Sequence, residues 1–183
     1  MNYAVHTIDT APDRARETLA GAEKSFGFIP NLLGTMAESP ELLKTYLAVG
    51  ALFDQTSFTP TERQVVMLAT SHENRCEYCM GAHTTIASMQ NVSDDVVQAI
   101  RDGRPIADPK LEALRRLTAA VVSSRGWPDE ADLAAFHRAG YGHAQVLEVI
   151  LGIGLKTFAN YVNHIAGTPL DKAFAKAAWK KPA

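Results

Sequence analysis

The chain has 183 residues and a mass of 19.8 kDa, a size that fits one domain. Hydrophobic residues make up 46% of it and charged residues 21%, as in an ordinary soluble globular protein. The formal net charge of -2 gives no reason to expect a nucleic acid or an anionic membrane as a partner.

Helix signals dominate the first third of the sequence. Prolines that fit a first helical turn are followed by apolar residues that recur at helical spacing. These signals predict helices over residues 12–26, 32–37 and 39–53.

The middle of the chain contains the clearest helix start, a capping box at residues 59–62 with the sequence TPTE. This helix is expected to break at residues 74–75, and the next one to begin with the cysteines that follow. Further caps and breakers predict helices over residues 93–103, 108–124, 128–140, 143–166 and 168–179. The predicted fold class is therefore all-α, a helical bundle of about eight or nine helices without strands.

We expect a single domain over residues 1–183. Its parts are a helical lead-in (1–58), a core that contains the cysteines (59–124) and C-terminal helices (125–183). The helix at residues 143–166 is apolar around most of its circumference, which predicts that it is buried. Its longest apolar stretch is interrupted by Glu148 and two glycines and cannot span a bilayer. The N-terminus is no signal peptide either, so the sequence favours a cytoplasmic protein.

The most informative motif joins the two cysteines of the chain to a histidine. Cys76 and Cys79 stand three apart, and His83 follows the second cysteine by four positions. On a helix, this spacing places His83 beside Cys79 and brings the two sulfurs close enough to bond. A helix N-terminus there would stabilise a thiolate and lower its pKa from about 8.5 to roughly 3.5–7.5. The motif predicts a dithiol redox centre in which one thiolate attacks, the other thiol resolves and the imidazole moves a proton.

Two other interpretations of this motif were weighed. A zinc site would need a fourth ligand from elsewhere, and His72, His143 and His164 are the candidates; structural zinc sites usually have two close ligand pairs, and the chain has one. Alternatively, both cysteines are ordinary core residues and His83 is a buried polar group with satisfied hydrogen bonds. Redox chemistry is preferred because the only two cysteines meet in one motif, with a histidine in register.

Several polar residues outside the motif are candidates for a supporting role. Asn160, Tyr161, Asn163 and His164 stand close together in the apolar helix at residues 143–166. They form either a hydrogen-bond network or oligomer contact, or the wall of a pocket. His72 either faces the site or lies on the surface.

The motifs together resemble a known superfamily. The matching segments are residues 59–66 (TPTERQVV), 73–79 (ENRCEYC) with Ala82 and His83, 26–33 (FGFIPNLL) and 157–171 (TFANYVNHIAGTPLD). They resemble the carboxymuconolactone decarboxylase superfamily, and within it the alkylhydroperoxidase D branch and its peroxidase-related proteins. The resemblance covers most of the chain and implies an all-helical bundle that assembles as trimers or hexamers.

The resemblance also implies roles for the motif. Cys79 would attack the peroxide, Cys76 would resolve the sulfenate as a disulfide, and His83 would relay the proton. The family pattern has a glutamate twelve residues before the first cysteine, where this chain has Gln64, so Glu73 is the candidate that takes its place.

Between the cysteines, the residue just before Cys79 is Tyr78, where some members have histidine. We expect Gln64, Tyr78, His72, Tyr161 and His164 as the residues around the catalytic group.

The expected function is a thiol-dependent peroxidase that reduces organic hydroperoxides or hydrogen peroxide, without a metal or other cofactor. Its expected partners are a peroxide, further copies of the chain and a protein dithiol reductant, such as a lipoyl-bearing protein or a peroxiredoxin. One alternative is a lactone decarboxylase of the superfamily's founding type, which generally does not depend on a cysteine pair. The other is a redox-sensing protein without turnover.

Overall fold

The computed structural model describes residues 3–180, and the outermost residues of the expected domain, 1–2 and 181–183, lie outside the described residues. The described residues form nine α-helices and one 3₁₀-helix, and no strand. The helices are α1 (Asp13–Phe26), α2 (Asn31–Met36), α3 (Pro40–Phe53), α4 (Pro60–Glu73), α5 (Glu77–Met89), α6 (Asp94–Arg101), α7 (Pro109–Ser123), α8 (Glu130–Arg138), α9 (His143–Ala166) and η1 (Lys172–Ala177). The predicted all-α class is confirmed.

The last element is shorter than expected. A helix was predicted over residues 168–179, whereas only Lys172–Ala177 is helical, and it is a 3₁₀-helix. The carbonyls of Ala177 and Ala178 accept hydrogen bonds from the Arg101 guanidinium, both at 3.1 Å, instead of continuing a helical ladder. The C-terminal segment is thereby fastened to α6.

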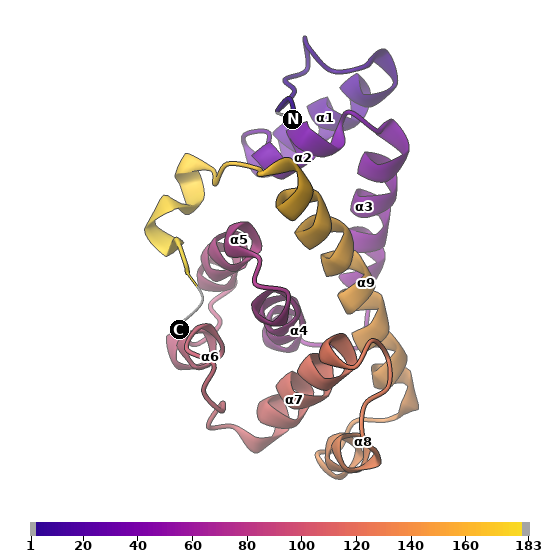
Figure 1. Ribbon diagram of the computed structural model, residues 1–183, viewed down its shortest axis with the longest axis vertical. Coiled ribbons are helices and arrows are strands. Elements are labelled where there is room, and N and C mark those ends of the chain that lie inside the picture. The colour runs from indigo at the N-terminus through magenta and orange to yellow at the C-terminus, as the bar shows by residue number, and fades with distance from the viewer. Residues whose placement is uncertain (1–2, 181–183) are drawn as a thin grey trace.

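Helix α4 lies in the middle of the molecule, with α5, α6, α7 and α9 around it (Figure 1). One core cluster surrounds α4 and includes Val65, Val66, Leu68, Leu114 and Phe136. A second cluster lies under the N-terminal layer formed by α1, α2 and α3, and it includes both cysteines. The cysteines are therefore enclosed by the N-terminal helices, the segment expected only as a lead-in.

Helix α9 crosses α4 and α3 at close range because of Gly152. A Cβ on Gly152 would lie 2.7 Å from side-chain atoms of both Phe53 and Val66, so no larger residue fits there without movement. Lys156 follows one helical turn later, on the side that faces α5. The close crossing thus positions the polar residues of α9 near the cysteines.

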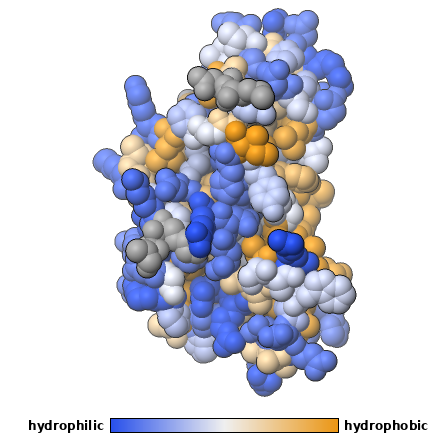
Figure 2. Space-filling model, in the orientation of Figure 1, coloured by the Kyte–Doolittle hydropathy of each residue, from blue (hydrophilic) through white to orange (hydrophobic). Residues whose placement is uncertain are grey.

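The expectation that α9 is buried is wrong for one of its faces. Its outward face contains large exposed apolar side chains, namely Leu147, Ile150, Phe158, Tyr161 and Ile165. Figure 2 shows apolar residues along the side of the molecule where α3 and α9 lie. The helix packs on its neighbours along one side only, because the bundle ends there. Within residues 3–180, no helix combines the length and the hydropathy needed to cross a membrane.

Candidate active site

The turn from α4 into α5 places both cysteines at a helix N-terminus. Arg75 adopts a left-handed conformation with φ 56°, and the Cys76 N–H then donates to the Ser71 carbonyl at 2.9 Å. Cys76 is the residue that precedes the first turn of α5, and Cys79 lies in that turn. Both thiols are free, and their residues are 0% and 1% exposed. The dithiol therefore lies at the positive end of the α5 dipole, away from solvent.

A buried lysine faces the second cysteine. Lys156 of α9 is 1% exposed, and its Nζ lies 3.9 Å from Cys79 Sγ and 2.6 Å from His83 Nε2. The half-buried phenol of Tyr46 also borders this ammonium. A buried ammonium is costly unless a negative charge balances it, and the nearest group that can supply one is the Cys79 thiolate.

The lysine determines the tautomer of His83. An ammonium has no acceptor, so Nε2 of His83 must accept from Lys156 and the ring proton must be on Nδ1. That Nδ1–H donates to Oε1 of Gln64 at 2.9 Å, and Nε2 of Gln64 donates to Oε1 of Gln90 at 3.1 Å. Burial, together with the charge of Lys156, holds the pKa of His83 well below its usual value. The imidazole is thus neutral and oriented at both nitrogens.

Two amides of α9 complete the polar surroundings of the sulfurs. Asn163 Nδ2 donates to Cys79 Sγ at 3.3 Å and to Cys76 Sγ at 3.7 Å. Asn160 accepts a 2.9 Å hydrogen bond from Asn74 through Oδ1. Both asparagines are buried.

These surroundings shift the pKa values of the two thiols in opposite directions. Burial acts to raise the pKa of Cys79, but the hydrogen bond from Cys76, the charge of Lys156 and the asparagine amides outweigh it and lower that pKa to about 6. The hydrogen bond that Cys76 gives to Cys79, together with burial, raises the pKa of the Cys76 thiol. The charge of the Cys79 thiolate raises the pKa of Lys156 against the effect of burial. Near neutral pH the site therefore holds a thiolate, a thiol and an ammonium.

Of the residues expected from the sequence, the structure brings Cys76, Cys79, His83 and Gln64 together. Glu73 lies elsewhere: its carboxylate is 3.5 Å from Nδ1 of His72 at the end of α4, and its charge acts on Arg115 of α7. Both ring nitrogens of His83 have other partners, Gln64 and Lys156. The contacts therefore do not support the expectation that Glu73 orients His83.

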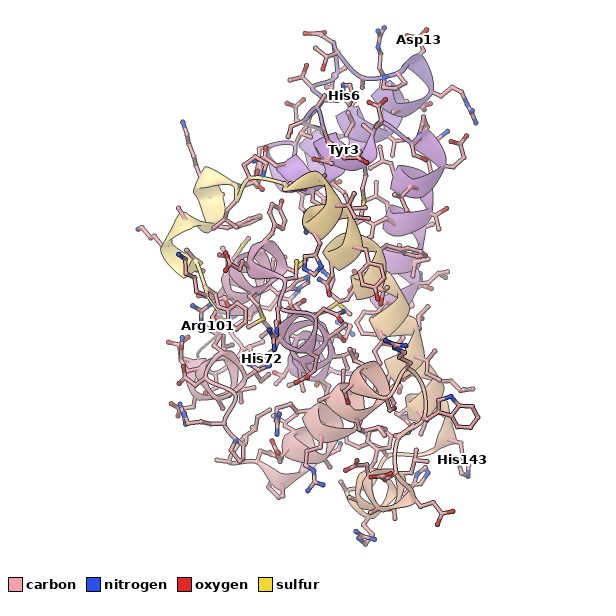
Figure 3. The ribbon with its side chains drawn as sticks, viewed as in Figure 1. Tyr3, His6, Asp13, His72, Arg101 and His143 are labelled. Atoms are coloured by element: carbon pink, nitrogen blue, oxygen red, sulfur yellow. The ribbon has the colours of Figure 1, made fainter. Side chains whose placement is uncertain are left out.

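The other expected surrounding residues point away from the dithiol. The Tyr78 hydroxyl donates to Asp171 at 2.5 Å and accepts from the Leu32 N–H at 3.2 Å, which ties α5 to α2 and the C-terminal segment. The ring of His72 packs on Trp179, on the side of α4 that faces Arg101 (Figure 3). Tyr161 and His164 are exposed residues of α9.

The described residues around the cysteines do not form a set of zinc ligands. Among residues 3–180, no three histidine, cysteine or acidic side chains cluster as metal ligands. The groups that surround the sulfurs are instead an ammonium and two amides, which are poor metal ligands.

The sequence interpretation missed Lys156, and it named Asn160 and Asn163 only as part of a hydrogen-bond network, an oligomer contact or a pocket wall. A signal was present, because these three residues are spaced i, i+4 and i+7 and so share one face of α9. Polar residues on one face of an otherwise apolar helix indicate a buried polar site.

Comparisons with known proteins agree with this geometry. Residues 40–120 match the model of the Carboxymuconolactone decarboxylase family. The matched segment contains Cys76, Cys79 and His83. The superfamily expected from the motifs is confirmed, although no curated protein matches the chain.

Solved structures show the same fold over nearly the whole chain. A peroxidase-related protein from Ralstonia eutropha, described as an alkylhydroperoxidase AhpD core, superposes with a TM-score of 0.83 at 21% identity and covers 94% of this chain and 93% of its own. A variant of the debrominase Bmp8 in complex with 2,3,4-tribromopyrrole gives 0.80 at 20% identity, with 97% and 96% covered. A peroxidase-related protein from a Silicibacter species gives 0.79 at 17% identity, with 94% and 93% covered. The chain has the alkylhydroperoxidase D-like fold.

Proposed function

We propose that the protein is a thiol-dependent peroxidase that reduces organic hydroperoxides or hydrogen peroxide. The observation that supports this most is the ammonium of Lys156, buried between the Cys79 sulfur and a neutral His83. It stabilises the thiolate that a peroxide must meet, and it can protonate the oxygen that leaves.

In the first step, the Cys79 thiolate attacks the terminal oxygen of R–O–O–H. The S–O bond forms and the O–O bond breaks, so Cys79 becomes a sulfenic acid and RO⁻ leaves. Lys156 gives this alkoxide its proton and becomes a neutral amine, which leaves the site without net charge. An uncharged site suits the low dielectric of the interior, where isolated charges are costly.

In the second step, Cys76 attacks the sulfur of the sulfenic acid. The neutral amine of Lys156 takes the proton of the Cys76 thiol and returns it to the departing hydroxide, which leaves as water. A Cys76–Cys79 disulfide remains. A dithiol then reduces this disulfide by exchange and is itself oxidised to a disulfide, so that each turnover yields one alcohol and one water.

His83 has a positioning role in this scheme. Its neutral Nε2 accepts from Lys156, and Gln64 holds the opposite nitrogen, so the ammonium is aimed at the sulfur. An amide serves better than a carboxylate here, because a carboxylate would favour an imidazolium that cannot accept from lysine.

The proposed partners are a protein dithiol reductant, such as a lipoyl-bearing protein or a peroxiredoxin, and further copies of this chain. The disulfide must receive two electrons, and a single dithiol molecule can supply both. The exposed apolar face of α9 supports a homo-oligomer, since contiguous apolar patches usually mark an interface.

Three other functions compete with the proposed peroxidase. The similar fold of a debrominase favours reductive debromination as a second candidate, because a dithiol can also supply the two electrons that replace a C–Br bond with C–H. A lactone decarboxylase would not need the cysteines. A redox sensor would use them once, without turnover.

The experiment measures consumption of hydrogen peroxide and of cumene hydroperoxide with dihydrolipoamide as reductant. We expect multiple turnovers in the parent and none in Cys79→Ser. Without the reductant, Cys76→Ser should consume about one equivalent and accumulate a sulfenic acid that dimedone traps. Bromide release from a brominated pyrrole with the same reductant tests the second candidate. If the parent consumes only a single equivalent of peroxide, the redox-sensor interpretation is favoured over the peroxidase. Peroxide turnover by Cys79→Ser would exclude the dithiol mechanism.

A further inference from the structure

Two buried polar atoms beside the dithiol lack a partner. Among residues 3–180, three buried side-chain polar atoms make no hydrogen bond, and two of them belong to this site: Nδ2 of Asn160 and Oδ1 of Asn163. Their residues are 0% and 5% exposed. A buried polar atom without a partner costs about 1–3 kcal/mol, so such atoms in a native fold need an explanation.

The positions of both atoms are determined by the bonded ends of their amides. Asn74 donates to Oδ1 of Asn160, so Nδ2 of Asn160 is the end left over. Asn163 uses Nδ2 for the two sulfurs, so its Oδ1 is left over beside them. Asn160 lies on the same face of α9 as Lys156 and Asn163, the face that contacts Cys79. The free ends are thus one donor and one acceptor, on two buried amides of the helix face that borders the dithiol.

We propose that Asn160 and Asn163 form the subsite that binds the peroxide group. This rests on the proposed function and names the residues that hold its substrate. A hydroperoxide has one O–H donor on the terminal oxygen and acceptor lone pairs on both oxygens. Oδ1 of Asn163 accepts the terminal O–H, Nδ2 of Asn160 donates to a peroxide oxygen, and Lys156 meets the oxygen that leaves.

The same contacts continue after the O–O bond breaks. The terminal oxygen and its hydrogen stay on Cys79 as the sulfenic acid, so Asn163 keeps the O–H it accepted. Asn163 also touches Cys76, the thiol that attacks next. The subsite therefore holds the oxidised sulfur in place for resolution.

A surface groove borders Asn74, the residue that holds Asn160. A groove of about 520 Å³ lies between α7, α8 and α9, lined in part by Val121, Ile150, Ile153 and Tyr161. Asn74, which holds Asn160, lines the same groove. In this proposal, the organic remainder of the peroxide lies on the side of Asn160 that faces this groove.

The test separates peroxide binding from thiolate reactivity. For each protein, the pH-independent rate constants of Cys79 with hydrogen peroxide and with iodoacetamide are measured, and their ratio is taken. Iodoacetamide has no O–O–H group, so the ratio removes changes in pKa and access. Asn160→Ala and Asn163→Ala should each lower the ratio roughly 10- to 100-fold, the effect of losing one buried hydrogen bond. Thr168→Val removes the third unpartnered polar atom, outside the site, and should leave the ratio unchanged.

The outcomes distinguish the two proposals. If the parent has a ratio well above that of dithiothreitol and both asparagine variants keep it within twofold, the subsite is overturned while the peroxidase stands. If the parent itself reacts with peroxide no better than dithiothreitol, relative to iodoacetamide, both proposals fail.

A second measurement does not depend on how the alanine variants fold. In a crystal structure of Cys79→Ser soaked with hydrogen peroxide, an O–O pair should lie within hydrogen-bond distance of Asn160 Nδ2 and Asn163 Oδ1. The subsite is overturned if those two atoms bond to each other or to other protein groups and peroxide lies elsewhere.

Discussion

The two faces of α9 reverse the usual distribution of polarity. The face that packs on α4 and α5 has an ammonium and two amides, Lys156, Asn160 and Asn163, whereas the face toward solvent has Leu147 and Ile165, which are 67% and 71% exposed. A surface helix of a monomer normally has the opposite arrangement. The comparison teaches that each anomaly needs its own cause. We propose thiol chemistry as the cause of the buried polar groups and assembly as the cause of the exposed apolar groups.

Replacing the buried ammonium should have the largest effect. In Lys156→Met, the Cys79 thiolate loses its balancing charge, so the pKa of Cys79 should rise from about 6 to its ordinary value or above. Alkylation by iodoacetamide at neutral pH should slow at least tenfold. Peroxide turnover should fall by roughly 10²–10⁴, because the acid for the leaving oxygen is also lost.

Lys172→Met is the matched control, since Lys172 is exposed and lies outside the site. It should change neither rate. An unchanged pKa of Cys79 in Lys156→Met, read from the alkylation rate against pH, would show that Lys156 does not activate the thiol.

The exposed face should determine assembly and leave the thiol chemistry alone. We expect the parent to be a homo-oligomer, and Phe158→Glu or Ile165→Glu should weaken association by at least about 100-fold, as for a charge placed in an apolar interface. Light scattering against concentration measures this. Met89→Glu, an exposed apolar position on α5, is the control and should leave the oligomer intact.

A parent that remains a 19.8 kDa monomer at micromolar concentration would refute this interface. Loss of iodoacetamide reactivity in the dissociated variants would show that the two faces of α9 are not independent.

The thiolate should also make stability depend on pH. The pKa of Cys79 is about 6 in the folded protein, whereas an unfolded cysteine has a pKa of about 8.5. Between these values the unfolded chain binds more protons, so the free energy of unfolding of the reduced protein rises with pH; the gain is complete above the unfolded pKa and is lost as pH falls through the folded one. Urea unfolding of the parent and of Cys79→Ser should differ by an amount that grows on the order of 1–3 kcal/mol across this window. If the free energies of unfolding of the two proteins change with pH in parallel, the lowered pKa of Cys79 is contradicted.

Local signals explain which parts of the fold were predictable. The capping box at residues 59–62, the break before Cys76 and the helix at residues 143–166 depend on neighbours in sequence, and the structure has all three. The spacing of Cys76, Cys79 and His83 likewise predicted that they meet. Only the final helix departed clearly, because long-range bonds to Arg101 replace its helical ladder.

The rest of the site depends on contacts between distant segments. Lys156 reaches Cys79 only because Gly152 lets α9 cross closely, and sequence spacing does not show which helices cross. The outward face of α9 was expected to be buried because periodicity shows an apolar surface without showing what covers it. Glu73 was the nearest acid in sequence, but the end of α4 directs it toward His72.

The smallest expected effect tests the residue that replaces the family's glutamate. Gln64→Glu would place a carboxylate at Nδ1 of His83 and favour the imidazolium, which cannot accept from Lys156, so the ammonium would lose its orientation. Peroxide turnover should fall about three- to tenfold, and its pH profile should gain an ionisation near the ordinary histidine pKa of about 6.5. Gln90→Glu makes the same change one hydrogen bond farther away and should alter turnover less than twofold. Glu73→Gln should also stay within twofold, because Glu73 occupies neither ring nitrogen of His83. If Glu73→Gln instead lowers turnover 100-fold while Gln64→Glu changes nothing, a carboxylate relay through Glu73 operates, and the buried face of α9 serves only to hold the thiolate.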